Sequence, residues 1–240
     1  MRLHLVEIHD LAACPPSLRN ALTDFLAFTE NVTGAYDPVG PLLRRAIECT
    51  KARRIVDLCA GAGGPWRRLA AEIDVPVVLT DLYPHGENVT RVDARAVPAE
   101  LDGFRTIFTA FHHFRPADAR AILADAVQLG QGIGVFELAR RAPREIAVVA
   151  LTWLGVVFAV PFMRPWRWSR ILWTYLPPTL PLVGTLDGIV SCLRTYSKAE
   201  LAGLVRGLDS YDWDIGDFRG GWSPLRGTYL IGVPKRALAH

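Results

Sequence analysis

One turn of the chain carries small residues at a spacing that suits ligand binding. The stretch Asp57-Leu-Cys-Ala-Gly61-Ala-Gly63-Gly64 follows the apolar pair Ile55 and Val56 and precedes a segment, 65–73, that predicts a helix. Glycine has no Cβ, so a ligand can approach such a backbone closely, and wound sheets bind ligands beyond the carboxyl ends of their strands. A plain tight turn would carry the same glycines, so the turn alone identifies no ligand.

Two carboxylates follow later strand-like runs and narrow the class of ligand. Asp81 ends PVVLTD, 20 residues after Gly61, where it could bind a ribose diol, and Asp93 follows the next run, where it could meet an adenine amine. A dinucleotide-binding turn needs a third glycine where this chain has Trp66, and no Lys-Ser or Lys-Thr pair of a phosphate-binding loop follows. The sequence therefore predicts an adenosine ligand without a pyrophosphate.

Two adjacent histidines are the candidates for acid–base chemistry. His112 and His113 follow the fourth strand-like run, and a histidine near its ordinary pKa can act as a general base at neutral pH. The alternative is that one of them packs against the ligand or caps the next helix. Glu137 ends the fifth run, where a salt bridge to a nearby arginine is favoured over catalysis. Cys59 has no activating neighbour in the sequence, which favours a structural role.

The elements that position these residues alternate between strands and helices. Such alternation is typical of a parallel sheet with helices on both faces, and strands that are apolar throughout fit burial on both sides. The last helix begins with a capping box, Ser197 to Glu200, and two further runs predict an antiparallel hairpin at the sheet edge. We therefore expect an α/β fold with a doubly wound, mostly parallel seven-stranded sheet. The expected strands cover 55–58, 76–81, 91–97, 104–114, 132–138, 211–218 and 227–236, and the expected helices cover 17–28, 41–52, 65–73, 116–129 and 197–208.

The composition excludes several classes of protein. Of the 240 residues, 50% are hydrophobic and 21% are charged, which excludes a disordered or fibrous chain. A net charge of +3 is small for a protein that binds a polyphosphate backbone, so no nucleic-acid partner is expected. The four cysteines lack zinc or redox spacing, so no metal is expected, and the charged first residues lack the apolar stretch of a signal peptide. These features predict a cytoplasmic protein with a single domain over 1–240, which begins with a helical segment at 1–48.

Taken in order, DLCAGAGG, LTD, VDA and TAFHHF resemble the class I S-adenosylmethionine-dependent methyltransferases. The resemblance covers residues 40–140 and, by the order of elements, 195–236. It implies S-adenosylmethionine as the cofactor and a Rossmann-like methyltransferase fold with an antiparallel last strand. The usual signature of that family is D-x-G-x-G-x-G, and Cys59 stands here at its first glycine position. The contacts that the resemblance implies are Asp57, Cys59, Gly61 and Gly63 for the methionine part, Asp81 and Leu82 for the ribose, and Asp93 and Ala94 for adenine.

The segment 143–193 interrupts the alternation and is rich in tryptophan and proline. Residues 146–163 carry no charge, and 18 such residues reach the lower limit of a membrane span. A single crossing is excluded because the last strands must return to the same sheet. The segment could lie on a membrane surface, form a homodimer contact, or cover the substrate as a lid, which we favour. In the lid, Trp153, Phe158, Phe162 and Trp173 would face inward and line an acceptor pocket with Tyr196, while Arg164, Arg167 and Arg170 would point to solvent.

These features together predict a methyltransferase that acts on a small apolar or amphipathic acceptor. Elimination or cyclisation of the same sulfonium ligand is a second enzyme class that the site could support. A third alternative is a non-catalytic protein that keeps the fold and binds a membrane surface or a partner through 143–193. The acceptor and the oligomeric state do not follow from the sequence.

Overall fold

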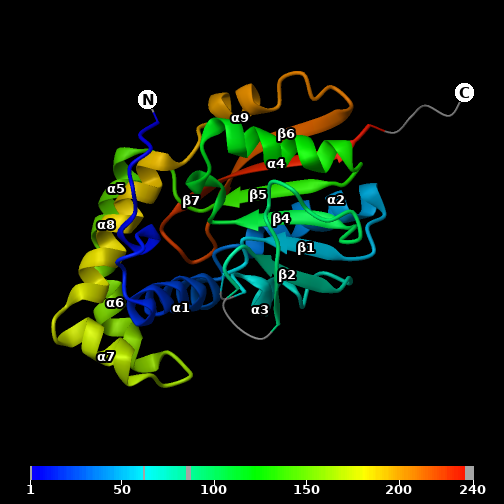
Figure 1. Cartoon of the computed structure of the whole chain (residues 1–240). Coiled ribbons are helices and arrows are strands. Elements are labelled where there is room, and N and C mark those ends of the chain that lie inside the picture. The colour runs from blue at the N-terminus through cyan, green and yellow to red at the C-terminus, as the bar shows by residue number, and fades with distance from the viewer. Residues whose placement is uncertain (1, 62, 85–87, 236–240) are drawn as a thin grey trace, which may run out of the picture.

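The computed structural model describes residues 2–61, 63–84 and 88–235 (Figure 1). Ala62 of the glycine turn and Arg236 of the last expected strand lie outside these ranges. Within them, seven strands form one sheet in the order β3-β2-β1-β4-β5-β7-β6. Strand β7 is antiparallel to both β5 and β6, whereas the other pairs are parallel, as predicted. The strands are β1 Ile55–Leu58, β2 Val77–Asp81, β3 Val89–Arg91, β4 Phe104–Phe108, β5 Ile133–Glu137, β6 Tyr211–Arg219 and β7 Arg226–Pro234.

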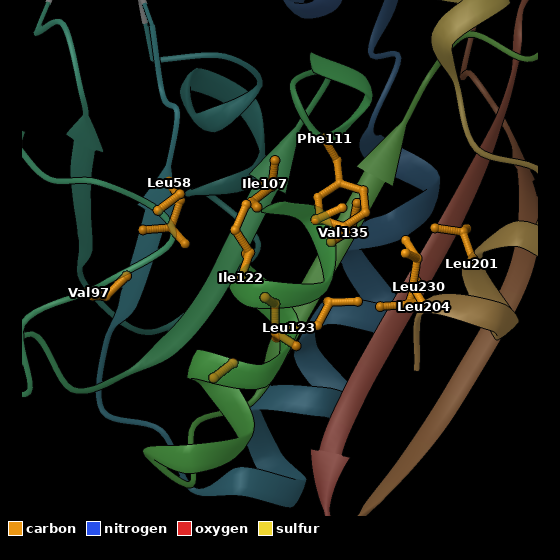
Figure 2. Packing of buried hydrophobic residues seen from close by; sticks show 14 of the residues in the cluster. Leu58, Val97, Ile107, Phe111, Ile122, Leu123, Val135, Leu201, Leu204 and Leu230 are labelled. Carbon is orange, nitrogen blue, oxygen red and sulfur yellow. The ribbon is translucent and has the colours of Figure 1, made fainter. Parts of the chain in front are cut away.

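Helices cover both faces of the sheet. In the cluster drawn in Figure 2, Ile122 of α4 and Leu201 of α9 pack with Val56 on one face. The neighbouring Ile55 packs with Leu43 of α2 in a second cluster, because successive residues of a strand point to opposite faces. This arrangement confirms the double winding. The α-helices are α1 Pro16–Thr33, α2 Gly40–Thr50, α3 Trp66–Leu69, α4 Pro116–Gln128, α5 Pro143–Ala150, α6 Thr152–Ala159, α7 Trp168–Tyr175, α8 Thr179–Arg194 and α9 Lys198–Leu204, and the 3-10 helices are η1 Ile8–Asp10, η2 Asp37–Val39, η3 Phe111–His113 and η4 Val160–Phe162.

Several elements differ from the boundaries that the sequence predicted. Strand β4 ends at Phe108 instead of running to residue 114, because Thr109 has a positive φ of 50° and Phe111–His113 form the 3-10 helix η3. Strand β3 covers Val89–Arg91 instead of lying within 91–97, because Asp93 accepts the backbone N–H of Arg95 and begins a turn. Helix α3 ends at Leu69, since Ala71 and Glu72 donate to carbonyls three positions back and form turns instead of α-helix. The capping box at the start of α9 is present as predicted.

The segment 143–193 forms a layer of helices next to α1, on the side of the sheet where β4 and β5 end (Figure 1). Leu22 and Phe25 of α1 are buried there against Val156 of α6 and Leu180 of α8. Helices α5 and α6 with η4 form a 20-residue stretch, Pro143–Phe162, that is long and apolar enough to cross a membrane, yet only 22% of its most apolar window is buried. The segment is therefore packed on the fold by one side and exposed on the other.

The prediction that the aromatic side chains of this segment face inward is wrong for three of the four. Trp153 is 47% exposed, Phe158 69% and Phe162 73%. Helix α6 packs on α1 through the fully buried Val156, which leaves these aromatic side chains outside. Only Trp173 is half-buried against that core.

One further expectation for this region needs correction. Arg164 and Arg167 are exposed as predicted, but Arg170 is only 2% exposed. Its guanidinium donates to the carboxylate of Asp24 in α1 at 2.5 Å, which fixes α7 to α1. The ring of Tyr196 packs in the core with α4 and its hydroxyl donates to a backbone carbonyl after η3 at 2.8 Å, and its contact with an acceptor stays a prediction.

Candidate functional site

The turn after β1 has a left-handed backbone at four positions. The φ angles are 59° at Cys59, 52° at Gly61, 91° at Gly63 and 45° at Gly64. Glycine adopts such angles without steric cost, so three of the four positions explain why the sequence has glycine there. The fourth is Cys59, which occupies the position of the family's first glycine, so this departure from the signature places a side chain on a strained backbone.

Cys59 allows a test of that strain. Cys59→Val adds apolar volume to a half-buried site, but a β-branched residue at positive φ is strongly disfavoured, so we expect a loss of about 1–2 kcal/mol in unfolding free energy. Cys59→Gly relieves the strain and loses a small packed side chain, so its stability should stay within about 1 kcal/mol of the native chain. Urea unfolding measures both variants. A valine variant as stable as the native chain would show that the turn is not strained.

Asp81 ties the glycine turn to the end of β2. Its carboxylate accepts the backbone N–H of Gly61 at 3.0 Å and that of Tyr83 at 2.8 Å. The next residue, Leu82, is half-buried. Asp81 therefore stands at the carboxyl edge beside the turn, where the sequence placed the ribose contact.

The expected adenine contacts lie one strand further out. The carboxylate of Asp93 forms an ion pair with Arg95 at 2.7 Å, and Ala94 beside it is buried. The ion pair and a hydrogen bond from the Arg95 guanidinium lower the pKa of Asp93. A bound adenine amine would share this carboxylate with Arg95, and the contact stays a prediction.

Two carboxyl groups next to the turn are buried without a cationic partner. Asp57, at 1% exposure, accepts a hydrogen bond from the Thr106 hydroxyl at 2.6 Å, and Glu30 of α1, at 7%, accepts one from the Thr109 hydroxyl at 3.0 Å. Burial is the main cause that raises the pKa of each to about 7; neighbouring acids, Asp81 for Asp57 and Asp57 for Glu30, add to it, and the threonine hydrogen bonds oppose it. Among the residues described, neither forms an ion pair, so this corner of the site is electronegative.

His112 lies between two carboxylates at the carboxyl edge of β4 and β5. It is 2% exposed, its Nδ1 lies 2.7 Å from Glu137, and its Nε2 lies 3.5 Å from Glu7. Burial lowers the pKa of His112, but the two carboxylates outweigh burial and raise it to about 9. The salt bridge that the sequence favoured for Glu137 is thus made with His112 and not with a nearby arginine.

His113 belongs to a network that joins the N-terminal segment to α8. Its Nδ1 lies 3.2 Å from Asp10, and burial together with the charge of His112 lowers its pKa. Glu7 is 3.1 Å from Arg194 of α8, and ligand atoms of Glu7, His9 and His113 lie within 4.8 Å of one another. The Arg194 guanidinium neutralises the charge of Glu7, so a protein side chain already supplies the positive charge that a metal ion would bring to this cluster.

Sequence reasoning missed Glu7 and Glu30, although both take part in the site. Glu30 continues the row of Leu22 and Leu26 at steps of four along the first helix, and an acid on that row was the available signal. Glu7 carried no comparable signal, since its partners lie more than 100 residues further along the chain.

The arrangement has counterparts among known structures. The chain is 11% identical to an O-methyltransferase family 2 protein from Planctomyces limnophilus in complex with apigenin, with 93% of this chain and 63% of that one covered and a TM-score of 0.53. Human N-acetylserotonin methyltransferase in complex with S-adenosylmethionine is 14% identical, with 88% and 56% covered and a TM-score of 0.44. A methyltransferase from Aquifex aeolicus is 11% identical, with 87% and 97% covered and a TM-score of 0.47. No protein-family model and no curated protein sequence matches the chain.

The strand order and the Planctomyces structure define the fold as that of the Rossmann-like, class I S-adenosylmethionine-dependent methyltransferases. This confirms the fold that the family resemblance of the glycine turn and the strand ends implied. At such low identity the likeness extends to the fold, and this chain spans about three fifths of the length of the Planctomyces and human proteins. Function has to be argued from the site.

Proposed function

We propose that this protein is an S-adenosylmethionine-dependent methyltransferase whose acceptor is a small apolar or amphipathic molecule. The observation that carries the proposal is the pair of buried, unpaired carboxyl groups, Asp57 and Glu30, beside the glycine turn of a methyltransferase fold. A buried carboxylate is costly unless a positive charge accompanies it. A cationic ligand at the turn would supply that charge.

S-adenosylmethionine fits these residues by its charges and shape. It carries an ammonium and a sulfonium, both of which favour an electronegative site, and it has an adenosine without a pyrophosphate. An added Cβ at Gly63 would meet Leu79 at 3.7 Å and no nearer atom, so the backbone there is open to a ligand. Asp57 and Glu30 would face the positive groups, and Asp81 would accept from the ribose hydroxyls. When bound, this cofactor supplies a methyl group that is displaced from sulfur by the acceptor.

His112 is the group best placed to remove a proton from the acceptor. Glu137 accepts from Nδ1–H and fixes the tautomer, which leaves Nε2 as the proton acceptor in the neutral ring. Nε2 faces Glu7 at 3.5 Å, so an acceptor reaches it only in exchange for Glu7. Because two carboxylates hold the pKa of His112 at about 9, its base form grows as the pH rises towards that value.

Cofactor binding is tested with Asp81→Ala. Each hydrogen bond from a ribose hydroxyl to a carboxylate contributes roughly 1.5–3 kcal/mol, so the affinity for S-adenosylhomocysteine should fall at least about tenfold in calorimetry. The same variant loses the two backbone contacts of Asp81, so circular dichroism and Asp209→Asn, which changes an exposed carboxylate in the turn between α9 and β6, serve as controls. Unchanged affinity in a folded Asp81→Ala chain would remove Asp81 from the site.

Product analysis tests the reaction itself. Incubation with S-adenosylmethionine and a panel of small phenols, amines and fatty acids should yield S-adenosylhomocysteine together with a methylated acceptor. Methylthioadenosine as the product would instead indicate elimination or cyclisation. A chain that binds neither S-adenosylmethionine nor S-adenosylhomocysteine would contradict the proposal.

A further inference from the structure

The helical segment 143–193 holds most of the large apolar side chains that the fold leaves exposed. Of the 21 exposed large hydrophobic residues among those described, 12 lie in this segment. Patches of that kind on a folded chain mark interaction surfaces. They lie on α6, η4, α7 and the start and middle of α8, with the turns between them, namely Leu151, Trp153, Leu154, Phe158, Phe162, Trp166, Trp168, Leu172, Tyr175, Leu176, Leu182 and Leu186. We call residues 151–176 the apolar tip. In Figure 1 its helices α6 and α7 lie at the lower left, away from the edge strand β6 at the top.

The charges that this segment exposes are all positive. Arg144, Arg164 and Arg167 are exposed, and the fourth arginine of the segment is buried against α1. The only acids of the segment, Glu145 and Asp187, are 2% and 5% exposed. The segment thus exposes an apolar surface that is bordered by arginines and carries no exposed acid. Such a surface is complementary to a partner that has an apolar interior beneath an anionic surface.

The aromatic and basic side chains of the apolar tip are arranged in contact. The guanidinium of Arg164 lies over the ring of Trp166 at 5.6 Å, and the rings of Trp166 and Trp168 pack edge to face at 5.9 Å. Tryptophan and arginine together suit the headgroup zone of a bilayer, where one part of the side chain is apolar and the other polar. The flanking apolar side chains would reach the acyl boundary.

The geometry disfavours the two other ways of covering this surface. A second copy in a two-fold dimer would bring together two patches whose exposed charges are all positive, and neither copy of the segment exposes an acid to pair with them. A single span is excluded because the strands on both sides of the segment, β5 and β7, pair in one sheet. Helix α8 also meets α7 at 78° and buries Asp187 and Arg194, so it is not a lipid-facing helix along its length.

We propose that the apolar tip docks on the surface of an anionic lipid bilayer, with Phe158, Phe162 and Leu176 at the acyl boundary and the arginines at the headgroups. Because α1 and α8 connect the tip to the carboxyl edge of the sheet, docking would hold the candidate active site close to the membrane. This inference does not depend on the proposed methyl transfer.

Flotation with vesicles tests the electrostatic part. The full chain should float with vesicles of one part phosphatidylglycerol to two parts phosphatidylcholine, and less with pure phosphatidylcholine or at high salt. Each basic residue near an anionic surface contributes about a factor of five, so Arg164→Gln with Arg167→Gln should lower the partition coefficient about 25-fold. Arg206→Gln, an exposed arginine after α9, is the matched control and should float as the native chain does.

A second set of variants tests the apolar part. Phe162→Ser, Trp166→Ser and Trp168→Ser combined should abolish flotation with both kinds of vesicle, whereas Trp222→Ser, at 92% exposure outside the segment, should not. All four side chains are exposed, so melting temperatures should stay close to the native value. Native flotation by the triple variant overturns the proposal. So does a dimer in sedimentation that the triple variant disrupts, if the native chain binds neither kind of vesicle.

Discussion

Replacing His112 with alanine is expected to lower turnover by about 10²–10⁴ while the affinity for S-adenosylhomocysteine stays within about threefold. The ring is fixed by Glu137 at 2.7 Å, and Nε2, which faces Glu7, is the nitrogen that we propose takes the proton. Because the alanine variant leaves the buried Glu137 without its side-chain partner, His112→Gln is the second variant, which keeps a hydrogen-bond donor near Glu137. Turnover is measured as S-adenosylhomocysteine release with a methylated acceptor from the panel described above.

The pH profile of turnover distinguishes a general base at His112 from a purely structural role of this residue. Since the pKa of His112 is held at about 9, turnover of the native chain should rise up to that pH. Glu7→Gln removes one of the two carboxylates that raise this pKa, so the profile should move to lower pH. His113→Ala is the control, because His113 faces Asp10 and Glu7 and does not contact Glu137. If turnover is near native in both histidine variants, alignment of the acceptor without a base is the better account.

The sheet could be predicted because each of its strands is a separate apolar run with a clear end. The runs at β1, β4 and β5 are buried on both faces and the run at β2 is mostly half-buried, and these runs alternate with helices of ordinary length. The turn after β1 was equally clear, because positive φ at Gly61 and Gly63 demands glycine. The third strand was misplaced, since an aspartate that starts a turn looks the same in sequence as one that ends a strand.

The orientation of the segment 143–193 could not be predicted in the same way. A helix that is apolar on all sides gives no period to show which side packs, so Val156 and Phe158 were equivalent in sequence, yet one is buried and the other exposed. The partner that buries Arg170 is Asp24, 146 residues earlier. Such pairs depend on how α1 meets α7, which no local pattern encodes.

The site followed from the sequence where its residues stand at strand ends. Asp81 was found by that rule and Asp57 through the family resemblance, and the structure places both beside the glycine turn. Glu30 and Glu7 come from the helix and the extended segment that precede the sheet, and they reach the site only through tertiary packing. The chemistry of the strand ends was therefore predictable, and the acids brought to them from residues 1–48 were not.

Asp57→Asn is expected to weaken S-adenosylmethionine binding about 100-fold at pH 8, because it removes a buried carboxylate that accompanies a positive ligand group. The pKa of Asp57 in the ligand-free chain is raised to about 7, and only the ionised form favours a cation. In the native chain the dissociation constant should therefore rise about tenfold from pH 8 to pH 6, and binding should displace about 0.1 proton at pH 8 and about 0.9 at pH 6. The variant should lose at least that part of the pH dependence, whereas Asp209→Asn should leave affinity and pH dependence unchanged. Calorimetry in buffers of different ionisation heat counts the proton.

The same substitution should act on stability with the opposite sign. The folded pKa of about 7 exceeds the ordinary value of 3.8, so the ligand-free fold binds more protons than the unfolded chain and loses stability as the pH rises from about 4 through 7. Without ligand, Asp57→Asn should therefore lose less melting temperature than the native chain between pH 5 and pH 8. Excess S-adenosylmethionine should reverse the order at pH 8, since it stabilises only the chain that binds it. If the melting temperatures of the two chains change with pH by the same amount, the pKa of Asp57 is not raised in the fold. The charge argument for a cationic cofactor would then fail.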